Sequence, residues 1–82
     1  MSMPSSLLKF KHTVETLDLV IFYKIQAGKY RFHVSIDKEE ENVFHFMSIY
    51  EDGEHIFAGS SQNEADIWNT IEEFIHRKDL IC

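Results

Sequence analysis

Two histidines in the segment YRFHVSIDKEEENVFHFM, residues 30–47, are the side chains whose types and spacing could support chemistry in this chain. Apolar and polar residues alternate into an acidic centre and out again, which is typical of two strands joined by a turn. Placing Phe32 opposite Phe46 pairs aromatic side chains across the two strands, as antiparallel sheets favour. This register predicts that His33 and His45 lie side by side on the other face.

Three interpretations of the histidine pair are open. Imidazole is a common metal ligand, but a stable site needs three or four ligands, and no cysteine, carboxylate or further histidine is expected to join this pair. Histidine also titrates near neutral pH, so the pair could form a pH-sensitive contact surface. We favour the third interpretation, in which both are ordinary polar residues on a partly covered sheet face. The sequence therefore predicts no metal and no other cofactor.

No other segment has the residue pattern of a catalytic site. Ser60 and Ser61 follow Gly59, but Ser61 has the capping-box spacing to Glu64 and is better explained as a helix cap than as a nucleophile. The P-loop, GxSxG and HExxH patterns do not occur in the sequence. The remaining carboxylates fall in predicted turns or on the polar face of a helix. We therefore expect a chain that is not an enzyme.

The elements around these residues predict an α+β fold in a single small domain, residues 1–82. An N-terminal helix is expected from apolar residues at helical spacing, namely Leu7, Phe10, Val14 and Leu17. Strands rich in β-branched and aromatic side chains are expected at residues 19–26, 30–36, 43–50 and 54–58. A second amphipathic helix follows Ser61. The predicted order is helix, antiparallel meander of three or four strands, helix.

Turn signals separate the predicted strands. They are Ala27-Gly28, the acidic run after Ile36, and Asp52-Gly53. Asp-Gly is the strongest of the three signals for a two-residue hairpin, because both positions of that turn need positive φ angles.

One face of the predicted sheet is apolar and aromatic, and we expect it to be the core beneath the C-terminal helix. Trp68 and Ile71 of that helix are expected to pack against Phe32, Phe46 and Phe57. The core residues that this register predicts on the strands are Leu19, Ile21, Tyr23, Ile25, Tyr30, Phe32, Val34, Ile36, Phe44, Phe46 and Phe57.

The second face of the predicted sheet is half apolar, whereas a merely solvated face would be more polar. A contiguous exposed apolar patch usually marks an interface, so we expect another protein or a second copy of the chain to bind here. The N-terminal helix could instead fold across this face. We favour both helices packing on the aromatic face. The predicted partner-binding residues are Val20, Phe22, Arg31, His33, His45, Met47, Ile49 and Ile56.

Charge is unevenly distributed along the chain. Residues 1–36 carry five bases and two acids, and residues 37–82 carry three bases and twelve acids, for a net charge of −6. Most nucleic-acid binders have a basic stripe instead, because phosphate contacts supply much of their affinity. The lone Cys82 builds no disulfide framework, and no segment has the pattern of a signal peptide or a membrane span. We expect a cytoplasmic protein without membrane insertion.

The order helix, three strands, helix resembles the double-stranded RNA-binding domain over most of the chain. In that family a glycine-rich loop and paired lysines open the second helix and hold phosphates across an RNA groove. The corresponding stretch is AGSSQNEADIW, residues 58–68, where Gly59 and Ser60 match loosely and Gln-Asn-Glu at 62–64 replaces the lysines. The resemblance implies the topology, and it makes a nucleic-acid-binding module the alternative function.

In size, acidity, aromatic content and single cysteine, the chain is also similar to the small accessory and inhibitor proteins of T-even-type phages. That set includes a lysis-inhibition accessory protein, a cytoplasmic antiholin. This resemblance in texture implies binding to a host or phage protein without catalysis. The leading hypothesis from the sequence is therefore a non-enzymatic protein-binding accessory or inhibitor protein.

Overall fold

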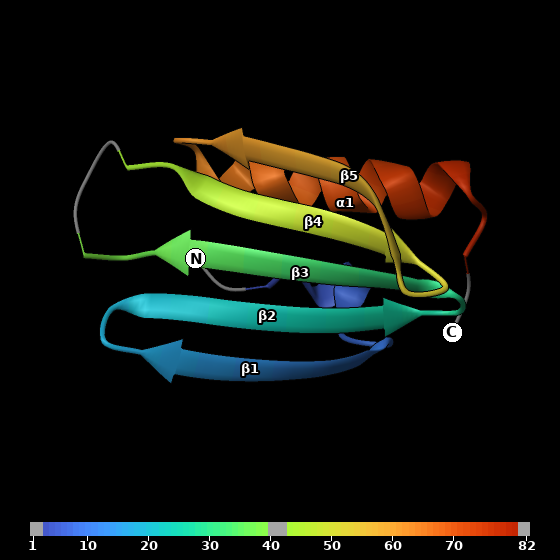
Figure 1. The fold of residues 1–82 in the computed structure, drawn as a ribbon, viewed down its shortest axis with the longest axis horizontal. Helices are drawn as coiled ribbons and strands as arrows, with labels where there is room; N and C mark the ends of the chain where they lie inside the picture. Colours follow the sequence, from blue (N-terminus) through green and yellow to red (C-terminus); the bar gives the residue numbers. More distant parts are fainter. Residues whose placement is uncertain (1–2, 40–42, 81–82) are drawn as a thin grey trace.

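The computed structural model describes residues 3–39 and 43–80, which form one antiparallel sheet with a helix on one side (Figure 1). The elements are η1 (Ser5–Leu7), β1 (Lys11–Leu17), β2 (Val20–Ala27), β3 (Tyr30–Asp37), β4 (His45–Glu51), β5 (Glu54–Ser61) and α1 (Glu64–Arg77). The five strands lie in chain order, β1-β2-β3-β4-β5. The α+β class is confirmed, but the sheet has one strand more than the longest predicted meander.

The expected N-terminal helix is not formed, and the prediction is wrong. The short 3-10 turn η1 and the edge strand β1 take its place. Of the four apolar residues that predicted the helix, Leu7 and Phe10 are buried, whereas Val14 and Leu17 are exposed. The β1 sequence, KHTVETL, contains three β-branched residues, which lose side-chain freedom in a helix and suit a strand. The four residues at helical spacing therefore belong to two different segments. Leu7 and Phe10 precede β1, and Val14 and Leu17 lie in it.

Tight turns make three of the four connections between the strands, and only β3 and β4 are joined by a longer one. The predicted turn at Asp52-Gly53 is confirmed, and both residues have positive φ, 51° and 84°, as a two-residue hairpin of this kind requires. The sequence predicts another turn at Ala27-Gly28, but the chain turns one residue later, at Gly28-Lys29. Gly28 has a φ of 63° there, which glycine adopts without steric cost. This shift keeps the same β2 and β3 side chains in the core.

The register between β3 and β4 differs from the predicted one by an odd number of residues. Phe32 pairs with Ile49 and not with Phe46. Because side chains alternate along a strand, an odd shift moves every β4 side chain to the opposite face of the sheet. The β4 side chains that become buried are His45, Met47 and Ile49.

Helix α1 covers the core face over β3, β4 and β5. Trp68 is 1% exposed, and its ring meets the Tyr23 ring edge-on, with the ring centroids 5.0 Å apart. The Phe74 ring packs in the same way against Tyr30 and Phe32, at centroid distances of 5.1 and 5.6 Å. These contacts fix the helix on the sheet through large side chains of both layers.

The N-terminal segment packs on the same side of the sheet as α1, where Figure 1 shows both behind the strands. Met3, Leu7 and Phe10 belong to the same buried cluster as the inner residues of α1. The Ser6 hydroxyl donates a hydrogen bond to the Glu72 carboxylate of the helix. The sequence favours an arrangement in which both terminal elements pack on the same face of the sheet. They do so here, although the N-terminal element is not a helix.

The predicted burial of Trp68 and Ile71 is confirmed, and both belong to the same buried cluster as Phe32. The prediction is wrong for several other core residues, because they lie beyond the edge of the helical layer or on the opposite face. The predicted core residues that are exposed are Leu19, Phe44, Phe46 and Phe57.

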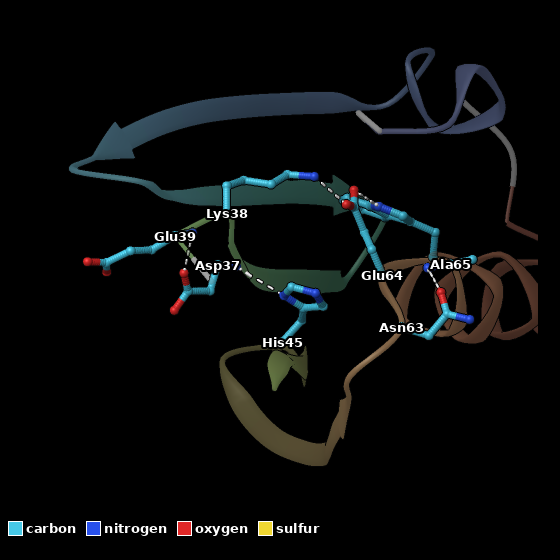
Figure 2. Close-up of polar contacts among 8 residues, drawn as sticks. Asp37, Lys38, Glu39, His45, Asn63, Glu64 and Ala65 are labelled. Carbon is cyan, nitrogen blue, oxygen red and sulfur yellow. Dashed lines mark hydrogen bonds and ion pairs between the residues drawn. The ribbon is translucent and has the colours of Figure 1, made fainter. Parts of the chain in front are cut away.

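The N-terminal cap of α1 is Asn63, whose Oδ1 accepts the Ala65 N–H at 3.0 Å (Figure 2). The sequence predicts Ser61 in that role, but the Ser61 hydroxyl accepts the Asn63 N–H and donates to Asp66. The capping-box prediction is therefore wrong. Asn63 is at least as good a cap as serine, and it stands directly before the first helical residue.

Candidate functional site

The face of the sheet opposite α1 is covered by no other element of the described chain, and we call it the open face. Three rows of paired residues cross it from β1 to β5. The first row is Glu15, Phe22, Ser35, Phe46 and Ser60. The second row is Thr13, Lys24, His33, Ser48 and Ala58. The third row is Lys11, Gln26, Arg31, Tyr50 and His55.

Two phenylalanine rings in the first row are the most apolar part of the open face. Phe22 is 40% exposed and Phe46 is 56% exposed. Ser35 lies between them in the row, and its small side chain leaves a shallow groove of about 180 Å³. Lys24 and His33 also line this groove. The groove therefore offers apolar walls with a cation at its margin.

Three rings form a ladder across the other half of the open face. The His33 and Tyr50 ring centroids lie 4.9 Å apart, and those of Tyr50 and His55 lie 5.2 Å apart. His33 Nε2 is buried, and it has no hydrogen-bond partner among the residues that the structure describes. Burial, together with the positive charges of Lys24 and Arg31, holds the pKa of His33 below its ordinary value. His33 is therefore held in its neutral form by its surroundings.

The open face carries cations although the chain as a whole is acidic. Within the part of the chain that the structure describes, Lys11, Lys24 and Arg31 form no ion pair, and all three lie in the second and third rows. Glu15 and Asp37 lie towards the other end of the same face. Most of the acids in residues 43–80, a range that the structure describes, lie in turns or on α1. The open face thus differs in charge from the rest of the surface.

The structure divides the predicted partner-binding residues between three places. Those on the open face are Val20, Phe22, Arg31 and His33. His45, Met47 and Ile49 are buried on the core face, so their prediction as partner-binding residues is wrong. Ile56 is the extra residue of a β-bulge, where the β4–β5 register shifts, and it lines a groove on the helix side.

The two histidines that the sequence places side by side are on opposite faces. His33 pairs with Ser48, and His45 pairs with Ser61. His45 is buried, and its Nδ1 accepts the backbone N–H of Asp37 at 3.0 Å (Figure 2). Among residues 3–39 and 43–80, no group of three or more histidine, cysteine or acidic side chains is placed to hold a metal ion. The histidine pair therefore forms no joint site.

A polar network at the end of the sheet has a structural explanation. Glu64 at the start of α1 accepts a hydrogen bond from Lys38 Nζ and another from Trp68 Nε1, the latter at 3.1 Å (Figure 2). Burial and the nearby Glu64 charge raise the pKa of Tyr23, which packs on the same tryptophan. These contacts tie the β3–β4 connection to the helix.

Sequence reasoning missed Phe46, Tyr50 and His55 as open-face residues. One signal was present in the sequence. In a strand, Phe46, Ser48 and Tyr50 share one face, and Met47 and Ile49 share the other. The second set is the more aliphatic, so it is the better core face for β4.

No helix within the described ranges has the length and apolar character needed to cross a membrane. Comparison of the chain with protein-family models, with curated proteins and with solved structures gives no match. Function is therefore inferred from the geometry of the chain itself.

Proposed function

We propose that this chain is a non-enzymatic protein-binding module that acts as an accessory or inhibitor protein and binds its partner through the open face. The observation that carries the proposal is the groove between Phe22 and Phe46, two exposed rings on a sheet face without a covering layer. Full burial of a large apolar side chain is worth about 1.5–3 kcal/mol, and these two rings, 40% and 56% exposed, forgo part of that free energy. A partner that covers them recovers that free energy.

Charge indicates the chemistry of the partner. Lys24 and Arg31 stand next to the groove and the ring ladder, and within the described chain no carboxylate pairs with them. A surface that joins apolar side chains to carboxylates would match both features of the open face. This fits an accessory or inhibitor role of the kind implied by the similarity in size and composition to the T-even-type phage proteins.

A single-stranded nucleic acid is the second candidate ligand. The His33, Tyr50 and His55 ladder beside Arg31 has the components of a stacking platform, in which bases lie on rings and phosphates meet cations. The double-stranded RNA-binding resemblance gives this candidate no support, because β1 stands where that topology needs a helix.

The proposal is tested by capture of the partner from the native host with three forms of the tagged chain. The double variant Phe22→Ser/Phe46→Ser removes both rings of the groove and is expected to lose the captured protein. Leu8→Ser is the matched control, because Leu8 is 53% exposed and belongs to no strand. Thermal melting of all three forms checks that the fold is retained.

The identity and salt dependence of the captured material separate the candidates. Protein that is retained by wild type and Leu8→Ser and lost from the double variant supports the proposal. Capture unchanged by the double variant contradicts it. Binding of a single-stranded oligonucleotide, weakening steeply with salt and with Arg31→Glu, would favour the second candidate instead.

A further inference from the structure

The two edges of the sheet differ in how they are protected against pairing with another strand. An edge strand presents unpaired N–H and C=O groups, and charged side chains usually block it. The β1 edge carries Lys11 and Glu15. On β5, Glu54 is the first residue, and residues 55–61, HIFAGSS, include no lysine, arginine, aspartate, glutamate or proline. The β5 edge therefore lacks the protection that β1 has.

An apolar groove runs beside β5 on the helix side of the sheet, with a volume of about 400 Å³. Phe57 pairs with the buried Ile49 and lies on the core face, but at the edge strand it is 47% exposed. Ile56, at the bulge, is 44% exposed. Phe74 of α1 forms part of the opposite wall. The edge thus combines free backbone groups with apolar side chains.

A stripe of polar residues on α1 lies along this groove. Asp66, Thr70, Glu73 and Arg77 follow one another at intervals of four, three and four residues, which places them on one side of a helix. Thr70, Glu73 and Arg77 line the groove. Asp66 accepts a hydrogen bond from Ser61 at the end of β5. The stripe therefore begins with an acid and ends with a base beside the edge strand.

We propose that β5 pairs antiparallel with β5 of a second copy of this chain, about a two-fold axis that passes near Ala58 and Gly59. The paired strands make one continuous sheet, and the two α1 helices lie antiparallel beside each other on the same face. Asp66 then faces the partner's Arg77, and the partner's Asp66 faces Arg77. The two-fold axis also places Phe57 of each copy at the interface.

Charge complementarity argues for a second copy as the occupant. A two-fold interface brings the same patch together twice, so a stripe with opposite charges at its two ends is complementary to itself. The middle of the α1 stripe and the proposed two-fold axis on β5 lie at the same level along the interface. A strand advances about 3.3 Å per residue and a helix about 1.5 Å, so the middle of the stripe lies level with residues 58–59 when Ser61 lies level with Asp66.

The Glu73–Arg77 ion pair does not oppose this arrangement. Both side chains are about two-thirds exposed, and exposed pairs at this spacing contribute little to stability. Arg77 is therefore free to share its guanidinium between Glu73 and a carboxylate of the second copy. Antiparallel helices also bring opposite ends of their dipoles together.

The test is sedimentation velocity over a concentration series, at about 0.15 M salt, where long-range charge effects are screened. Wild type is expected to form a dimer with rising concentration. Phe57→Lys places a charge on the β5 edge and should raise the dimer dissociation constant about tenfold or more. Val14→Lys is the matched control, because Val14 is 51% exposed on the core face of the opposite edge strand. It should leave the dimer unchanged.

A charge exchange tests the orientation. Asp66→Arg and Arg77→Glu should each weaken the dimer, and the double variant Asp66→Arg/Arg77→Glu should recover part of the loss, because the exchanged charges again face each other. Circular dichroism of each variant checks that the helix is retained at the temperature of the measurement. Recovery in the double variant is not expected if the helices lie elsewhere.

Several results would overturn the proposal. A wild-type chain that stays monomeric throughout the series contradicts it, as does a dimer that Val14→Lys disrupts and Phe57→Lys does not. A dimer lost in Phe22→Ser/Phe46→Ser but kept in Phe57→Lys would place self-association on the open face. Because the two pairs of variants lie on different surfaces, failure of edge pairing leaves the proposed partner binding standing.

Discussion

The two faces of the sheet are made by the same strands, yet equivalent side chains have different consequences on them. Phe32 on the core face is fully buried beneath α1, whereas Phe46 on the open face is 56% exposed. The first ring contributes to the stability of the monomer because it is removed from water. The second contributes little until something covers it. An aromatic residue in a strand therefore stabilises the fold on one face and, under the proposed function, is available for binding on the other.

The largest difference between the faces is expected at Trp68. Trp68→Ala should lower the free energy of unfolding by roughly 3–5 kcal/mol, since it empties a large buried site and removes the partner of Glu64. That is much of the stability of a small domain. Urea titration followed by circular dichroism measures it. A midpoint close to that of wild type would mean that α1 does not cover the core face.

Met47 and Phe46 are neighbours on β4 that lie on opposite faces of the sheet, so substitutions at the two positions compare the faces directly. Met47→Ala should lower the free energy of unfolding by about 2–4 kcal/mol, because Met47 is 2% exposed. Phe46→Ala should change it by less than about 1 kcal/mol, as for surface substitutions. Both are measured by the same titration. Reversal of the two effects would restore the register in which Phe46 is a core residue.

The smallest expected effect lies on the open face, at His33. Its pKa in the folded chain is lowered from 6.5, so the unfolded chain binds that proton at higher pH than the folded chain does. The free energy of unfolding should therefore decrease as pH falls through about 6.5, and the contribution is fully present above that value.

His33→Asn isolates this contribution, because the other histidines are the same in both chains. The variant should show a flatter dependence of stability on pH than wild type between about pH 7 and the lowered pKa. Thermal melts across a pH series measure both. A steeper dependence in the variant would mean that His33 gains a proton on folding and is not held neutral.

The helix and most of the core were predictable because their signals are local. The apolar stripe that includes Trp68 and Ile71 has the period of a helix, and both residues are buried as expected. The alternation in β2 and β3 likewise identified Tyr23 and Phe32 as core residues. The helix cap was missed by two residues, since Ser61 and Asn63 are both good caps and only the geometry of the turn distinguishes them.

The candidate site was predicted in part. The existence of a half-apolar second face followed from the alternation in β2, which contributes Phe22. The β4 residues of this face were predicted wrongly. The predicted β3–β4 register differs from the observed one by an odd number of residues, so it places Met47 on the face where Phe46 lies. The helical spacing at the N-terminus was misleading, since Leu7 and Phe10 precede β1 and are buried in the same cluster as residues of the distant α1.

The sequence by itself determined strands β2 to β5, the amphipathic helix and the hairpin at Asp52-Gly53. Each of these depends on residues close together in the chain, and a two-residue turn fixes the pairing of the strands that it joins. Only the tertiary structure decided which β4 side chains face α1. β3 ends at Asp37 and β4 begins only at His45, and a connection of that length does not fix the register. Burial of the whole face beneath the helix therefore decides the register, and it places Met47 in the core and leaves Phe46 exposed.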